Sequence, residues 1–240
     1  HTRSLCDWSS DVCSSDLTFH ASSTSEEKEI QNQFGRSAKI HVAIDLVEPR
    51  KLVTVERVKN EGQLKMFFLS RISPKKNLLG TLKLLQQLPN NNSITFDIYG
   101  PIEEELYWKE CESIIQNMPS HVKVNYKGIL KNSEVIDAMT NYHLSVLLTF
   151  NENYGHSIVE SMAAGCPVLI SDQTIWKQLQ EKKAGWDLPL VQEEKIINAI
   201  TEACSWNQEE FNQYSHGALT FAQQIFDDQE GVAQNKKLFE

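Results

Sequence analysis

The stretch ENYGHSIVESMAAG, residues 152–165, places two glutamates around a glycine and the start of a predicted helix. Gly155, His156 and Ser157 would open that helix. The first backbone amides of a helix have no intrahelical acceptor, and they lie at the positive end of the helix dipole. Such a helix start favours an anion, above all a phosphate.

The two glutamates, Glu152 and Glu160, lie on either side of this helix start. Glu160 falls just over one turn into the helix, so both carboxylates would lie near the same ligand and accept hydrogen bonds from hydroxyl groups. A phosphate flanked by two polyols is a sugar nucleotide, with the ribose on Glu160 and the hexose on Glu152. The pair alone is a weak pattern, because a solvent-facing Glu152 and a helix-surface Glu160 explain it equally well.

Two cations follow an earlier apolar segment, in the sequence SRISPKKN. Arg71 offers a planar fork for phosphate oxygens, and Lys76 offers a mobile point charge. Together they would suit a diphosphate near a helix start, but a solvated basic turn is the simpler explanation of these two residues taken alone.

Two glycines also end predicted strands, Gly100 in YGPIEEE and Gly128 in KGILKNSE. A glycine there would let the backbone approach a flat ligand closely. Ordinary turn formation explains each of them equally well.

These loops need parallel strands to bring them together. Apolar segments rich in β-branched and aromatic residues alternate with helical patterns, and the predicted strands are KMFFLS, SITFDIYG, HVKVNYKG, HLSVLLTF, CPVLISD and GWDLPL. One of the predicted helices is TIWKQLQEK, residues 174–182. The alternation predicts an α/β fold with a Rossmann-like, doubly wound parallel sheet, which binds its ligand at the carboxyl ends of the strands.

Composition excludes several other classes. The net charge of −9 argues against a nucleic-acid partner, and no apolar run reaches the roughly 18 residues that span a bilayer. After residue 17, Cys111, Cys166 and Cys204 are widely spaced without a metal-ligand pattern, which favours a reduced cytoplasm and predicts no metal site.

The first seventeen residues, HTRSLCDWSSDVCSSDL, have neither a helical nor a strand period. They resemble the translation of a sequencing-library adapter, which predicts a disordered artefact at residues 1–17 and a fragment that lacks its true N-terminus. A Ser-rich tail, or a secreted segment with Cys6 paired to Cys13, is the alternative. We then expect a domain remnant at residues 18–46, a polar linker at 47–63 and the main domain at 64–240.

The combined pattern resembles the nucleotide-sugar-binding, C-terminal half of a group 1 (family 4) glycosyltransferase with the GT-B fold. The resemblance runs from about Thr18 to the C-terminus, and it rests on Arg71 with Lys76, Gly100, Gly128, Glu152, Gly155, Glu160 and the run MAAGCPV. It implies that residues 18–46 are the end of the acceptor-side domain. It also implies that His156 lines the phosphate through its backbone rather than acting as a general acid.

The resemblance implies a retaining hexosyltransferase that uses a UDP- or GDP-sugar, without a cofactor or metal, and a glycan or lipid-linked acceptor in cell-surface polysaccharide synthesis. Arg71, Lys76 and Glu152 would be its catalytic residues. It places the enzyme in the cytoplasm, with peripheral association at the inner face of the plasma membrane left open, and it predicts that this fragment is inactive alone. A non-catalytic nucleotide-binding module, or a GT-B relative such as a sugar-nucleotide epimerase, remains an alternative.

Overall fold

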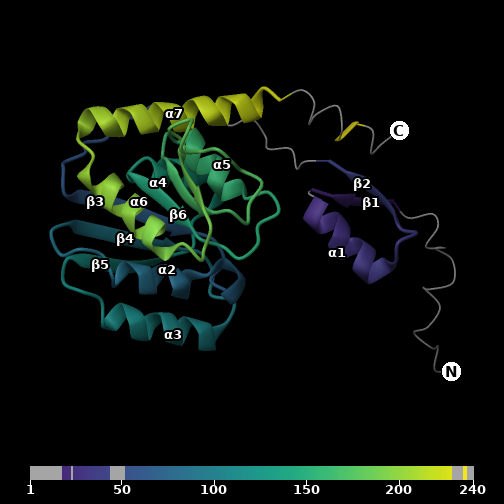
Figure 1. Cartoon of the computed structure of the whole chain (residues 1–240), viewed down its shortest axis with the longest axis horizontal. Coiled ribbons are helices and arrows are strands. Elements are labelled where there is room, and N and C mark those ends of the chain that lie inside the picture. The colour runs from purple at the N-terminus through teal and green to yellow at the C-terminus, as the bar shows by residue number, and fades with distance from the viewer. Residues whose placement is uncertain (1–17, 23, 44–51, 229–234, 237–240) are drawn as a thin grey trace. The chain divides into compact units, whose positions relative to one another are not determined.

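The computed structural model describes residues 18–22, 24–43, 52–228 and 235–236 (Figure 1). The chain divides into two compact units, residues 1–47 with 228–240 and residues 48–227. The predicted artefact at residues 1–17 lies outside the described residues.

The first unit contains a short helix between two strands. Strand β1 (Thr18–Ala21) and strand β2 (Lys39–Val42) pair in parallel, and helix α1 (Thr24–Phe34) connects them. The ring of Phe34 packs on that of Phe19 with centroids 4.7 Å apart, yet 54% of Phe34 remains exposed. The described part of this unit is therefore small and leaves apolar surface uncovered.

Within the described residues, the second unit is built on a six-stranded sheet of order β5-β4-β3-β6-β7-β8, in which every neighbouring pair is parallel. The strands are β3 (Gln63–Leu69), β4 (Ser93–Tyr99), β5 (Val122–Gly128), β6 (Leu144–Leu147), β7 (Val168–Ser171) and β8 (Gly185–Leu188). The chain runs outward from β3 to β5 and then outward in the opposite direction from β6 to β8. The predicted doubly wound sheet is confirmed, and its switch point lies between β3 and β6.

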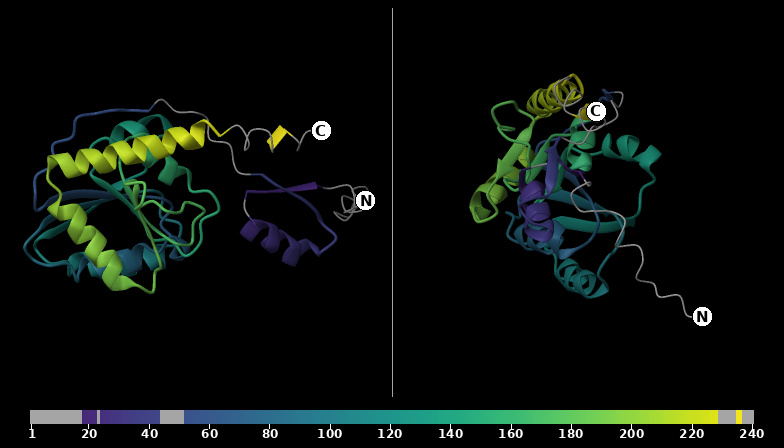
Figure 2. Two further views of the ribbon diagram at one scale, coloured as in Figure 1. Left: turned by 45° about the horizontal axis from the view of Figure 1, so that its top comes forward. Right: turned by 90° about the vertical axis from the view of Figure 1, so that its right-hand side faces the viewer.

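Helices cover both faces of this sheet (Figures 1 and 2). On one face α4 and α7 contact α5, and on the other α3 and α6 contact α2. Their bounds are α2 (Leu78–Leu85), α3 (Glu105–Gln116), α4 (Val135–Met139), α5 (His156–Ala163), α6 (Glu193–Ser205) and α7 (Gln208–Phe226). Because both faces are covered, consecutive strand residues are buried, and Met66, Phe67 and Phe68 are each at most 1% exposed.

The described part of the segment predicted as a linker, residues 52–63, belongs to the second unit. The guanidinium of Arg57 is almost fully buried and donates to the backbone oxygens of Tyr142, at 2.9 Å, and Ala164, at 3.0 Å. The polar composition predicts a linker, and in the structure backbone carbonyls bind the Arg57 cation of this segment. A sequence does not show which carbonyls are left without partners by secondary structure.

The helix predicted at residues 174–182 is absent from the structure, which has turns there. Gln178 and Lys183 have φ angles of 60° and 52°, in the left-handed region that interrupts a right-handed helix. The indole Nε1 of Trp176 donates to the backbone oxygen of Tyr154 at 2.6 Å. This tertiary contact holds the segment against the loop before α5, and it outweighs the local helical pattern.

Candidate functional site

The loops after β3 and β6 meet at the switch point of the sheet. Lys76 ends a short 3₁₀ helix, η1 (Pro74–Lys76), and Glu152 lies between β6 and α5. The Lys76 Nζ atom lies 2.5 Å from Glu152 Oε2, and the two side chains are only 8% and 16% exposed. The structure therefore joins two residues that the sequence analysis selected from separate loops.

Backbone and side-chain hydrogen bonds tie these two loops together next to the ion pair. The backbone oxygen of Lys75 accepts from the Phe150 amide and from Thr149 Oγ1, each at 3.0 Å. Asn77 Nδ2 donates to the backbone oxygen of Leu148 at 2.9 Å. Lys76 and Glu152 are thus brought together by the fold and not by side-chain flexibility alone.

Gly155 forms the start of α5 and lies under the side chain of Glu152. Its φ of 80° is left-handed, and its backbone oxygen accepts the Ile158 amide at 2.8 Å. A Cβ atom at this position would lie 2.7 Å from Ile158 Cδ1 and 3.1 Å from Glu152 Cγ. The left-handed φ would strain any other residue, and a Cβ would crowd both neighbours, so glycine at position 155 lets Glu152 lie over the helix start.

Three further predicted residues lie in the first two turns of α5. His156 is exposed, with its ring centroid 4.9 Å from that of Tyr154, and Ser157 and Glu160 are half-buried. Glu160 lies just over one helical turn beyond the start of α5, as its spacing from Glu152 predicts. The ribose, hexose and phosphate roles of these residues stay predictions.

Arg71 does not contact the buried pair of Lys76 and Glu152 but pairs with another carboxylate. Its Nη1 atom is 2.7 Å from Glu103 Oε1, and the two side chains are 61% and 35% exposed. This partner was not predicted from the sequence, although the acidic run at residues 103–105 in the next loop was a signal for it. An exposed ion pair is weak and screened by salt, so Arg71 can exchange Glu103 for another anion at little cost.

The two glycines predicted at strand ends, Gly100 and Gly128, differ in their structural surroundings. Gly100 and Gly128 are joined by a hydrogen bond of 2.9 Å from the Gly100 amide to the Gly128 oxygen. A Cβ at Gly100 would lie 1.8 Å from the Ser70 oxygen, so the approach of a neighbouring strand end already requires glycine there. At Gly128, with a φ of 80°, a Cβ would meet nothing within 4 Å, so that glycine borders open space.

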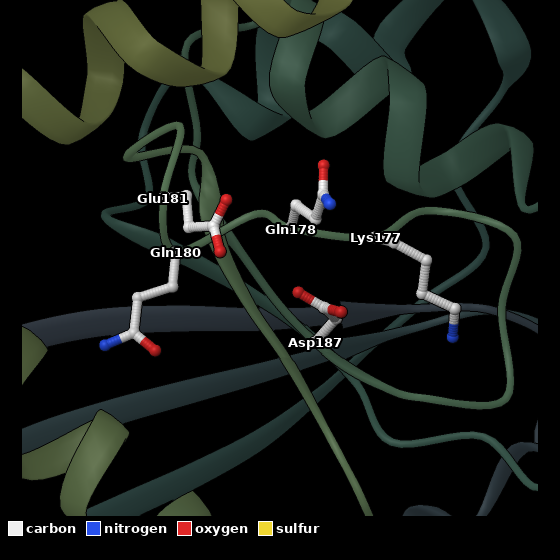
Figure 3. Close-up of a pocket in the computed structure, with 5 residues that line it drawn as sticks. All are labelled: Lys177, Gln178, Gln180, Glu181 and Asp187. Carbon is white, nitrogen blue, oxygen red and sulfur yellow. The ribbon is translucent and has the colours of Figure 1, made fainter.

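A pocket also lies away from these loops, between the turns that precede β8 and β8 itself (Figure 3). It is lined by Lys177, Gln178, Gln180, Glu181 and Asp187. None of the residues predicted to bind a ligand lines it, and Asp187 Oδ1 already accepts the Leu179 amide at 3.0 Å. The switch-point loops therefore remain the better candidate site.

The described part of the chain also bears on metal sites and membrane-spanning helices. No cluster of three or more His, Cys, Asp or Glu side chains there is arranged to hold a metal ion. In the same residues, every helix is too short or too polar to cross a membrane.

Comparison with known proteins gives a family and a set of similar structures. The family model described as "Glycosyl transferases group 1" matches residues 51–216. No curated protein matches the chain. A mutant of S. aureus TarM, in complex with fondaparinux, alpha-GlcNAc-glycerol and UDP, has a TM-score of 0.71 and 16% identity over 92% of this chain and 43% of its own.

Two other solved structures are similar. Anabaena Alr3699/HepE, in complex with UDP and glucose, has a TM-score of 0.66 and 20% identity over 91% of this chain and 61% of its own. WaaG, a glycosyltransferase involved in lipopolysaccharide biosynthesis, has a TM-score of 0.64 and 13% identity over 85% of this chain and 58% of its own. The chain thus spans about half the length of these proteins, and at such identities the likeness shows the fold.

Proposed function

The chain belongs to the group 1 glycosyl transferase family, and on this premise we propose that residues 48–227 are the donor-binding domain of a retaining glycosyltransferase. The donor is a UDP- or GDP-sugar. The observation that carries the proposal is the meeting of Lys76, Glu152 and the start of α5 at the switch point of the sheet. Ligands of doubly wound sheets bind at this position.

The proposed chemistry is electrostatic stabilisation of a leaving diphosphate. Negative charge grows on the diphosphate oxygen as its bond to the sugar breaks, and Lys76, Arg71 and the N-terminal end of α5 stabilise that charge. Glu160 accepts hydrogen bonds from the ribose, and Glu152 from the hexose. The backbone of His156 and Ser157, rather than the imidazole, faces the phosphate.

The acceptor, a glycan or lipid-linked molecule in polysaccharide synthesis, is assigned to the other domain, of which residues 18–46 are the proposed remnant. We therefore expect this chain to bind the donor without transferring sugar. The full-length enzyme is assigned to the cytoplasm, and its association with the inner face of the plasma membrane stays open. Three buried free thiols, Cys111, Cys166 and Cys204, fit a reducing compartment.

Calorimetry with UDP, GDP, UDP-glucose and GDP-mannose tests the donor site. We expect Glu160→Gln to weaken the free diphosphate ten- to a hundredfold, since a hydrogen bond to a charged group is worth about 1.5–3 kcal/mol. Glu152→Gln should reduce the preference for the sugar conjugate over the free diphosphate. Glu181→Gln, in the pocket of Figure 3, is the matched control and should change neither affinity.

Three results would count against this function. If no nucleotide binds at millimolar concentration, the donor-site assignment is wrong. If Glu181→Gln weakened nucleotide binding as much as Glu160→Gln does, the pocket of Figure 3 would be the better candidate for the donor site. Conversion of the sugar in the absence of an acceptor would indicate an epimerase.

A further inference from the structure

The ion pair between Lys76 and Glu152 joins two groups that serve different parts of the proposed donor. Lys76 is assigned to the phosphates and Glu152 to the hexose, yet in the structure they bind each other at 2.5 Å. Both side chains are largely excluded from water, so salt screens this pair much less than a surface pair. Any anion that binds the Lys76 ammonium must therefore displace the Glu152 carboxylate.

We propose that Glu152, through this ion pair, makes the site favour the sugar-bearing donor over the free nucleoside diphosphate, an inference that rests on the proposed function. When a free diphosphate binds Lys76, the Glu152 carboxylate loses its cation and lies close to the negatively charged diphosphate. A poorly hydrated carboxylate without a partner is costly. The sugar conjugate brings hydroxyl groups that donate to the released carboxylate, which offsets that cost.

The pair therefore acts after transfer as well as before it. Once the sugar has left, Glu152 has lost its hydroxyl donors and competes again for Lys76, which promotes release of the diphosphate. If Glu152 contacted only the hexose, its replacement would leave the free diphosphate's affinity nearly unchanged. With the ion pair, Glu152→Gln releases Lys76, and we expect UDP to bind roughly tenfold more tightly.

The chain offers a matched control in its second pair at the same edge of the sheet. Arg71 Nη1 and Glu103 Oε1 lie 2.7 Å apart and are likewise opposite in charge, but their side chains are 61% and 35% exposed. Water and salt already stabilise both partners there. Glu103→Gln should therefore change UDP affinity by less than about threefold at physiological salt.

The experiment is a double-mutant cycle on the full chain, with Glu152→Gln, Lys76→Gln and the double variant, titrated with UDP and UDP-glucose by calorimetry. We expect UDP to bind more tightly to Glu152→Gln, more weakly to Lys76→Gln, and equally to Lys76→Gln and the double variant. That equality is the decisive result, because it shows that Glu152 acts through Lys76. Glu152→Asp, which keeps the charge on a shorter side chain, should give a smaller gain and replaces Glu152→Gln if thermal melting shows the latter unfolded.

Other outcomes overturn the proposal in distinguishable ways. If Glu152→Gln increases the affinity for UDP equally with and without Lys76, the effect is simple charge repulsion. The ion pair then does not have the proposed role. If UDP binds the parent and Glu152→Gln equally, the inference fails while the donor site stands. If no variant binds UDP or UDP-glucose, the donor site fails and the inference fails with it.

Discussion

The two edges of the large sheet use the same cation in different ways. At the carboxyl edge, the ammonium of Lys76 faces the carboxylate of Glu152. At the amino edge, Lys59 is equally buried, but its ammonium donates to three backbone oxygens at 2.9 Å, those of Asn60, Cys204 and Trp206. Neutral backbone carbonyls stabilise Lys59 within the fold, whereas the carboxylate that faces Lys76 can be exchanged for a ligand anion.

Other buried polar groups at the amino edge follow the same rule. The guanidinium of Arg57 donates to carbonyls, and His143 donates from Nε2 to the Val58 oxygen and accepts the Lys65 amide at Nδ1, each at 3.1 Å. These partners assign the neutral tautomer with the proton on Nε2. Burial lowers the pKa of Arg57 and Lys59 and lowers that of His143 to about 4. The amino edge is thus a structural region, and four predictions test its contrast with the carboxyl edge.

The largest expected effect is on stability at the amino edge. Arg57→Ala leaves the backbone oxygens of Tyr142, Ala164 and Gly165 without this donor. We expect the free energy of unfolding to fall by about 3 kcal/mol, measured by urea denaturation. Lys131→Ala, at a side chain that is 81% exposed, is the control and should change it by less than about 0.5 kcal/mol. A similar loss in both variants would remove the distinction between the edges.

The second prediction exchanges the two lysines in turn for methionine. Lys76→Met should weaken UDP binding ten- to a hundredfold because a charge-assisted contact to phosphate is lost, worth about 1.5–3 kcal/mol. Lys59→Met should leave UDP affinity unchanged but lower the melting temperature, since three carbonyls lose their donor. Calorimetry and thermal melting on both variants measure the contrast. Weakened UDP binding in Lys59→Met would show that the two edges are coupled.

The third prediction concerns pH. The pKa of His143 is about 4 in the folded protein and 6.5 when unperturbed, so the unfolded chain binds the proton first. Its contribution to stability is complete above pH 6.5 and is lost progressively as the pH falls toward 4. Between pH 7.5 and 5 this loss is about 2 kcal/mol.

Because carboxylates also titrate in that range, the pH effect of His143 is read as a difference. The advantage of the parent over His143→Gln in urea denaturation should shrink by about 2 kcal/mol between pH 7.5 and 5. A constant difference across that range would mean that His143 keeps its ordinary pKa in the folded protein.

The smallest expected effect is at Arg71, the exposed cation of the carboxyl edge. Arg71→Ala should weaken UDP two- to fivefold at physiological salt, because exposed charge pairs contribute at most about 1 kcal/mol. The effect should grow at low salt, where screening decreases. A loss as large as that of Lys76→Met, independent of salt, would place Arg71 inside the buried site.

The sequence alone supported the sheet, the order of its strands along the chain and the loops that carry charge. Strands covered on both faces are continuous apolar runs, and the start of α5 has the glycine and polar residues of a helix start, so local pattern was enough. The helix predicted at residues 174–182, which the structure lacks, shows the limit of prediction from local pattern. Its local pattern is helical, but Trp176 is held by the distant Tyr154 carbonyl.

Pairing across the sheet depended on the tertiary structure. Lys76 and Glu152 were each selected from their own loop, but their contact follows from β3 and β6 being neighbours, which the order of strands along the chain does not show. Likewise Lys59 and Lys76 are the same residue type in the sequence. One is structural and one faces the candidate site, because carbonyls at helix ends surround the first and a carboxylate from another loop meets the second. Residue type and periodicity are local properties, whereas the partner of a buried charge depends on which segments the fold places beside it.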